Sequence, residues 1–311
     1  MFADRSKTPA DADFNHFFVK CEGVMKMKVT SMCVALASAV LMSASANACT
    51  VFAATGPEFV QGGGTLISKV RDERSFKHVV KTVKPEQGYT YTGLFNGKKQ
   101  KFNMGVNEKG FVVFRTTTGS VPKEVRKQYK RFKSEDGFDG QEFLIRNCAS
   151  VDEALKHVEV FSKEPTNYMM ADAKKIAVVE VLPGGKHVVT VKDRGTLTHT
   201  NHYITKDSFE CNVVSSQSSQ VRLNRIRKLL DTTAKPFSIQ DFINFTEDKN
   251  DGPDDSIFRV GTPGMDVSTT LATMAVYIPE QGAPEIYLKW RDNPDDKTSW
   301  QSKREKVDFG K

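Results

Sequence analysis

Cys49 stands where a cysteine could become the first residue of a mature protein. It directly follows an Ala-x-Ala sequence that ends at Ala48, and residues 29–57 carry no charged side chain. A positively charged flank, a short apolar stretch and an Ala-x-Ala sequence are together typical of a secretory signal peptide. The pattern predicts removal of residues 1–48, an N-terminal extension and signal peptide, and export to the periplasm or the medium.

A cysteine at the start of a chain carries both a nucleophile and a base. The thiolate is the reactive form of cysteine, and a free α-amine, with a pKa of about 7.7–8.0, can accept the thiol proton near neutral pH. The same amine can later protonate a leaving amine, so Cys49 is the predicted catalytic nucleophile.

Two other interpretations of Cys49 stay open. It could be an inert, buried cysteine, which is common for isolated cysteines. It could also be acylated after cleavage, in which case the chain would be a non-catalytic lipoprotein. Lipoprotein signals usually have leucine three residues before the cysteine, whereas this chain has Ala46 there.

Length and charge limit the class of protein. Residues 49–311 suffice for one large domain with a sizeable core. The net charge is +7, but basic residues are mixed with glutamate and no nucleic-acid-binding motif is present, so nucleic acid is not an expected partner. The apolar run before Cys49 is too short for a stable membrane span, which needs about 20 residues. Assembly into a homo-oligomer is left open.

The remaining cysteines and histidines do not predict a metal site. The sequence has no CxxC or zinc-type spacing. His199 and His202 are three residues apart in an expected strand, where their side chains would point to opposite faces. Cys148 and Cys211 could pair or remain free. We expect no metal and no cofactor.

Several segments, in their order and spacing, resemble one group of enzymes. An opening Cys-Thr strand is followed by a second strand that ends in Asp72. Later come a Gly-x-Asn-Glu-x-Gly turn, an Ala-Asp…Val-Val-Glu hairpin, a Thr-Asn-His segment and a Ser-Ser-x-x-Arg helix start, within residues 105–111, 167–180, 198–203 and 218–225. The chain resembles the choloylglycine hydrolase and acyl-CoA:isopenicillin N acyltransferase family of N-terminal-nucleophile (Ntn) hydrolases.

The resemblance implies a hydrolase of linear amide C–N bonds, similar to penicillin acylases and carcinine hydrolase. Its substrate would be a small-molecule N-acyl amide, and Cys49 would carry the acyl group as a thioester. An N-acyltransferase on the same scaffold is the alternative. By the same resemblance, Asp72 would contact the amine of the nucleophile, Asn201 would donate a hydrogen bond to the oxyanion, and Arg222 would be an active-site arginine.

Three further positions are implied at the oxyanion hole or the pocket. Thr117 falls near a residue that helps to form the oxyanion hole. Lys69 stands where bile-salt hydrolases carry a pocket arginine. Arg225 is the second choice to Arg222 for the active-site arginine.

Apolar patterns predict the elements that must position these residues. We expect strands over 49–55, 64–71, 111–117, 176–181, 187–192, 272–278 and 285–290, and helices over 122–132, 140–148, 151–161, 219–232 and 239–245. The helix over 151–161 should bury Val151, Leu155 and Val158, and the polar residues 293–311 should be peripheral. This mixture predicts a single α+β domain, and the resemblance implies a four-layer αββα Ntn-hydrolase sandwich.

Overall fold

The computed structural model describes residues 48–310 apart from 74–76, 292, 294–295 and 297. The predicted signal peptide therefore lies outside the described residues, except for Ala48. Among the helices of the described part, none is long and apolar enough to cross a membrane.

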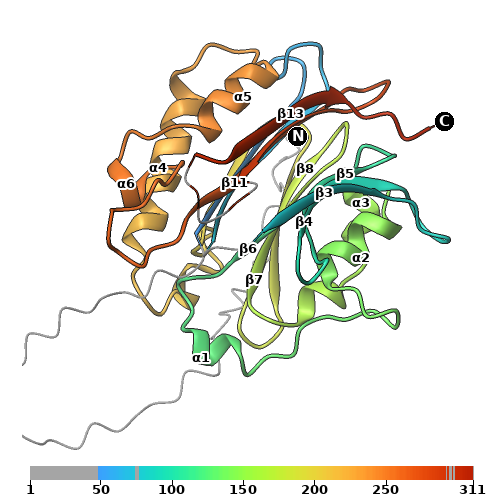
Figure 1. Cartoon of the computed structure of the whole chain (residues 1–311). Coiled ribbons are helices and arrows are strands. Elements are labelled where there is room, and N and C mark those ends of the chain that lie inside the picture. Colours follow the sequence, from blue (N-terminus) through green and yellow to red (C-terminus); the bar gives the residue numbers. More distant parts are fainter. Residues whose placement is uncertain (1–47, 74–76, 292, 294–295, 297, 311) are drawn as a thin grey trace, which may run out of the picture.

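Two antiparallel sheets form the centre of the molecule (Figure 1). The first sheet has the strand order β10-β1-β2-β11-β12-β13. Its strands are β1 (Cys49–Thr55), β2 (Thr65–Glu73), β10 (Gly195–His199), β11 (Thr269–Ile278), β12 (Glu285–Arg291) and β13 (Trp300–Lys306). All seven residues of β1 are buried, which explains why this strand is a continuous run of apolar and small residues rather than an alternating one.

The second sheet is a meander in which each strand pairs with the next along the chain. Its strands are β3 (His78–Val83), β4 (Tyr91–Asn96), β5 (Phe102–Asn107), β6 (Val112–Thr117), β7 (Thr166–Ala171), β8 (Ile176–Val181) and β9 (His187–Lys192). The link from β9 to β10 joins the two sheets at one edge.

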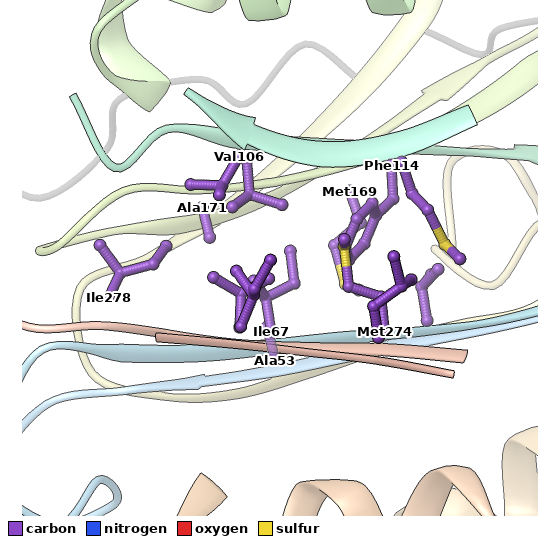
Figure 2. Packing of buried hydrophobic residues seen from close by; sticks show 14 of the residues in the cluster. Ala53, Ile67, Val106, Phe114, Met169, Ala171, Met274 and Ile278 are labelled. Carbon is purple, nitrogen blue, oxygen red and sulfur yellow. The ribbon is translucent and has the colours of Figure 1, made fainter. Parts of the chain in front are cut away.

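The main core lies between the two sheets. Figure 2 shows Ile67 and Met274 of the first sheet facing Phe114 and Met169 of the second. Because alternate residues of a strand point to opposite faces, Ala53 belongs to this layer while its neighbours point the other way. The thiol-bearing face of Cys49 is the same face, since Cys49 and Ala53 are four residues apart on β1.

Helices cover the outer face of each sheet (Figure 1). Helices α4 (Gln217–Thr232) and α5 (Ile239–Thr246) pack on the first sheet, where Phe52 contacts the rings of Phe242 and Phe245. Helices α2 (Gly140–Asn147) and α3 (Val151–Ala154) pack on the second sheet. The layers therefore follow the order αββα, which confirms the predicted four-layer α+β fold.

Two predicted helices are shorter than expected. The helix expected over 122–132 is only α1 (Lys123–Arg126), because the residues that follow crowd like charges at helical spacing, which is unfavourable. The helix expected over 151–161 ends at Ala154. The chain then turns so that Val160 and Phe161 enter the core, and Val158 is 55% exposed rather than buried.

The C-terminal residues also differ from the prediction, and three early strands were not predicted. Residues 293–311 were expected to be peripheral, but they contain β13, and Val307 and Phe309 join the core between the sheets. Strands β3, β4 and β5 were absent from the expected set. β13 is an edge strand with mostly polar side chains, so it lacks the apolar alternation by which a half-buried strand is found.

Candidate active site

Pairing of β1 with β2 brings Asp72 to the start of β1. The register places Cys49 opposite Arg71, so Asp72, the next residue of β2, lies beside the peptide group between Ala48 and Cys49. The backbone N–H of Asp72 donates to the carbonyl oxygen of Ala48 at 2.9 Å. Cys49 is 4% exposed and Asp72 is fully buried, so this corner is shielded from water.

Arg222 and Asn201 hold the backbone of Cys49. From α4, Nη1 of Arg222 donates to the Cys49 carbonyl oxygen at 2.7 Å and to Oγ1 of Thr50 at 3.0 Å. The Asn201 side-chain oxygen Oδ1 accepts from the Cys49 backbone nitrogen at 2.8 Å and from Nη2 of Arg222 at 3.0 Å. The nitrogen of Cys49, which would be the α-amine of a processed chain, therefore has a fixed acceptor.

Asn201 is oriented from both ends. Its Nδ2 donates to the carbonyl oxygen of Thr117, at the end of β6, at 2.7 Å, and its backbone N–H donates to Oγ of Ser219 on α4 at 2.8 Å. Thr117 thus contributes a backbone carbonyl that orients Asn201.

A buried carboxylate fastens the segment that carries Asn201. Glu180 on β8 is fully buried, and its oxygens accept from Nε2 of His199 at 2.8 Å and from the hydroxyls of Thr205 and Ser208. Although burial raises the pKa of Glu180, these donors bring it down to about 2. The carboxylate therefore ties β8 of the second sheet to the segment after β10. Among the described residues, neither His199 nor His202 belongs to a cluster that could hold a metal ion.

Asp72 is a carboxylate held in an apolar corner with cations nearby. Burial raises the pKa of Asp72 to about 6, and the positive charges of Arg259 and Arg222 oppose that rise. Oδ1 accepts from the hydroxyl of Thr270 on β11 at 2.7 Å. Oδ2 has no hydrogen-bond partner in the described part of the chain. A group that lies next to the Cys49 nitrogen and titrates near neutral pH is suited to influence the protonation of an α-amine.

The thiol faces a different set of charges between the sheets. Burial raises the pKa of the Cys49 thiol, and the nearby charges of Lys69 and Arg71 lower it. Burial lowers the pKa of Lys69 to about 8. Its ammonium group donates to the carbonyl oxygens of Arg115 at 2.8 Å and Asn103 at 3.4 Å. A thiolate at Cys49 would therefore be stabilised by a neighbouring cation that forms no ion pair with a carboxylate in the described residues.

Arg225 and Cys148 are occupied elsewhere. Arg225 forms a two-pronged ion pair with Asp248, at 3.0 and 2.6 Å, on the flank of α4. Arg222, one turn earlier, is the arginine that the structure brings to Cys49. Cys148 carries a free thiol whose pKa burial raises to about 12. It is therefore not paired with Cys211 and is chemically inert at neutral pH.

Three polar residues at the site were missed in the sequence: Glu180, Arg259 and Thr270. Glu180 appeared there only as part of a hairpin. Arg259 follows Ile257 and Phe258, and Thr270 opens an apolar strand. No motif marks them, because what distinguishes them is burial beside Asp72 and Asn201, which depends on contacts distant in the chain.

We expect the Asp72→Asn variant to have a higher free energy of unfolding but a lower catalytic activity. A carboxyl whose pKa is raised in the folded state binds its proton more tightly there, so its contribution is most favourable below pH about 4 and is lost as pH rises through about 6. Two pKa units correspond to about 3 kcal/mol. At pH 8 the free energy of unfolding should rise by about 1–3 kcal/mol, with little change at pH 4.

Urea unfolding at both pH values would measure this effect. Asp248→Asn is the matched control, since it breaks the ion pair with Arg225 and should not stabilise the protein. An unchanged or lower stability of Asp72→Asn at pH 8 would contradict a buried, ionised Asp72.

The chain is similar to one known protein family and to several solved structures. The family model described as "Acyl-coenzyme A:6-aminopenicillanic acid acyl-transferase" matches residues 72–293. No curated protein matched the chain. Similar solved structures include penicillin V acylase from Agrobacterium tumefaciens, with 15% identity and a TM-score of 0.49, covering 79% of this chain and 84% of that one.

Two further structures are similar at the same level. One is a Caenorhabditis elegans ortholog of N-acylethanolamine-hydrolyzing acid amidase, with 12% identity and a TM-score of 0.49, covering 81% of this chain and 99% of that one. The other is a mutant of conjugated bile acid hydrolase from Clostridium perfringens, with 14% identity and a TM-score of 0.48, covering 84% and 97%. At such identities none of the three bears on the substrate of this chain.

Proposed function

Because the chain belongs to the acyl-coenzyme A:6-aminopenicillanic acid acyl-transferase family, a group of Ntn-hydrolase-like proteins, we propose that it hydrolyses linear amides with Cys49 as its N-terminal nucleophile. The observation that carries the proposal is the arrangement around the Cys49 nitrogen. Asn201 Oδ1 accepts from it at 2.8 Å, and Arg222 holds both Asn201 and the Cys49 carbonyl. A buried hydrogen-bond acceptor for this backbone nitrogen would have a function if the nitrogen became a free amine.

Removal of residues 1–48 is the activating step in this proposal. In the uncut chain the nitrogen of Cys49 is an amide, which cannot act as a base at neutral pH. Cleavage would turn it into an amine, with Asn201 Oδ1 as acceptor and the carboxylate of Asp72 nearby. It would also remove Ala48, whose carbonyl oxygen occupies the Asp72 backbone N–H. The cleaved enzyme would work in the periplasm or outside the cell.

The reaction then follows from the charges at the site. The α-amine takes the thiol proton, and the thiolate, next to the cation of Lys69, attacks the amide carbonyl carbon. The carbonyl oxygen becomes an oxyanion, for which Asn201 is the proposed donor and Thr117 the residue that orients it. One such donor is typically worth about 3 kcal/mol in the transition state. The C–N bond breaks as the protonated α-amine gives its proton to the leaving amine, and water then cleaves the thioester.

An N-acyltransferase is the second candidate, because the description of the family names that activity. Both activities share the thioester on Cys49 and differ only in whether water or an amine takes the acyl group. Adding a free amine during turnover would separate them, because a transferase makes a new amide at the expense of the free acid.

The test combines processing with turnover. Intact-mass analysis of the protein exported from cells should give a chain that begins at an unmodified Cys49. That chain should cleave at least one member of a panel of N-acyl amides that includes penicillin V, conjugated bile salts and acyl-homoserine lactones. A lipid adduct on Cys49 would replace the proposal with a lipoprotein, and a processed chain that cleaves no amide would contradict it.

A further inference from the structure

Arg259 is a buried cation that forms no ion pair with the described residues. It lies in the segment between α6 (Gly252–Asp255) and β11, and only 3% of it is exposed. Its Nε has no hydrogen-bond partner among the described residues, and no carboxylate oxygen of those residues lies within 4.0 Å of its guanidinium nitrogens. Buried arginines are almost always paired, because an uncompensated buried charge is costly. This guanidinium is therefore a candidate for binding an anionic ligand.

The backbone of Arg259 is fixed beside the proposed active site. Its N–H donates to Oγ1 of Thr270 at 2.8 Å, and its carbonyl oxygen accepts from the Thr270 N–H at 2.9 Å. The same Thr270 hydroxyl donates to Asp72. Of the charges around Asp72, that of Arg259 lowers its pKa most. Arg259 is thus close to Asp72, although the two form no direct ion pair.

Several cations around Cys49 have no carboxylate at ion-pair distance among the described residues. On the thiol side, Arg71 pairs with Glu73 at 3.5 Å and Arg115 pairs with Glu164 at 2.7 Å. Three buried cations form no such pair among the described residues: Lys69, Arg222 and Arg259. The carboxylates of Asp72 and Asp255 both act electrostatically on Arg222. A thiolate at Cys49 would lie near Lys69, whereas the guanidinium of Arg259 would still have no carboxylate at ion-pair distance in the described part of the chain.

Removal of Ala48 would give a ligand a way in. Ala48 is 5% exposed and is hydrogen bonded to Asp72, so its loss exposes the corner between Cys49 and Asp72. The segment that carries Arg259 also reaches solvent at once, since the next residue, Val260, is 38% exposed and Met265 is 55% exposed. The chain therefore passes from a buried position at Arg259 to the surface within one residue.

We propose that Arg259 is the carboxylate-binding residue of the Cys49 site and that the preferred substrates are N-acyl amino acids. This proposal rests on the proposed amidase function and names its leaving group. The carboxylate of the amino acid would accept hydrogen bonds from the guanidinium, while the amine released from the scissile bond would lie near the unpartnered Oδ2 of Asp72. The planar fork of arginine is well matched to a carboxylate.

Matched substrates test this directly. We would compare N-acylglycines with N-acylethanolamines that carry the same acetyl, octanoyl or phenylacetyl group, since each pair differs by a carboxylate against a hydroxyl-bearing carbon. A charge-assisted contact predicts that the processed enzyme prefers the glycine derivative in kcat/KM by about 10- to 100-fold. In Arg259→Gln the preference should fall to about threefold or less, whereas Arg259→Lys should retain part of it.

The ratio of kcat/KM between the two substrates of a pair isolates the role of Arg259 in substrate recognition. Any effect of Arg259 on Asp72 or Cys49 acts on both substrates alike and cancels, so a loss of rate with an unchanged ratio would overturn the proposal. Arg304→Gln is the matched control, because it removes an arginine from the edge strand β13, where Arg304 pairs with Glu285. Its ratio should equal that of the wild type.

A binding measurement separates this proposal from the proposed reaction. Calorimetric titration of the processed Cys49→Ser variant should give at least about tenfold tighter binding for the acylglycine than for its ethanolamine partner, and Arg259→Gln in that background should abolish the difference. If the processed wild-type enzyme cleaved none of these amides, such selective binding would keep the carboxylate site and contradict the proposed amidase. Equal binding, or none, would overturn the carboxylate site itself.

Discussion

The Cys49→Ala variant is expected to lose amide turnover by at least about 10³-fold, because the acyl group then has no atom to which it can be transferred. The loss should be in kcat, with substrate binding largely kept, since methyl and thiol groups differ little in size. Steady-state kinetics on any amide accepted by the processed wild-type enzyme would measure it. Because Cys49 is 4% exposed and lies in the fully buried β1, unfolding curves must show that the variant still folds.

Cys148→Ala is the matched control for this experiment. Cys148 is also buried and free, but it lies after α2 on the other side of the second sheet, and burial raises the pKa of its thiol to about 12. Its removal should change stability more than turnover. Full activity in Cys49→Ala, or loss of activity only in Cys148→Ala, would reject Cys49 as the nucleophile.

The Asn201→Asp variant is expected to lower kcat by about 10²- to 10³-fold. The substitution keeps an oxygen that can accept from the Cys49 nitrogen and from Arg222, so the contacts at 2.8 and 3.0 Å can persist. It replaces the Nδ2 donor by a carboxylate oxygen that faces the Thr117 carbonyl. An oxyanion would then meet a negative charge instead of a proton donor, which raises the barrier of the chemical step.

Comparison of kcat with KM would distinguish this effect from a loss of structure. Asn244→Asp, an exposed residue of α5, is the matched control and should leave both constants unchanged. If Asn201→Asp retained kcat within a few-fold, the proposed oxyanion role of Asn201 would be wrong, and its contacts would serve only to orient the Cys49 backbone.

The helices and strands were predicted most reliably where a segment is buried along its whole length or where its apolar residues recur at a regular spacing. The strand over 49–55 and the helices over 219–232 and 239–245 have close counterparts in β1, α4 and α5. β1 is a continuous run of apolar and small residues, and the two helices have an apolar period that indicates which face is covered. The apolar pattern did not predict β13. This edge strand pairs with β12 through its backbone, and few of its side chains are apolar.

The charged residues of the site show where local reasoning ends. Arg222 and Arg225 lie three residues apart on one basic helix, so in the sequence they are nearly equivalent. In the fold Arg222 is 1% exposed against Cys49, while Arg225 pairs with Asp248. That difference depends on which residues of α4 are buried against the sheet, and a short stretch of sequence does not decide this.

The sequence by itself therefore predicted Cys49 as the nucleophile and determined the order of the motifs and most of the elements that carry them, because motifs and apolar patterns are local. Only the tertiary structure decided which charges surround Cys49. It put Asn201 and Arg222 on the backbone of Cys49, Asp72 beside the preceding peptide group and Lys69 near the thiol. It also buried Arg259 with no carboxylate within 4.0 Å among the described residues. Burial and pairing of charge depend on contacts between segments far apart in the chain, and those contacts exist only once the sheets and helices have packed.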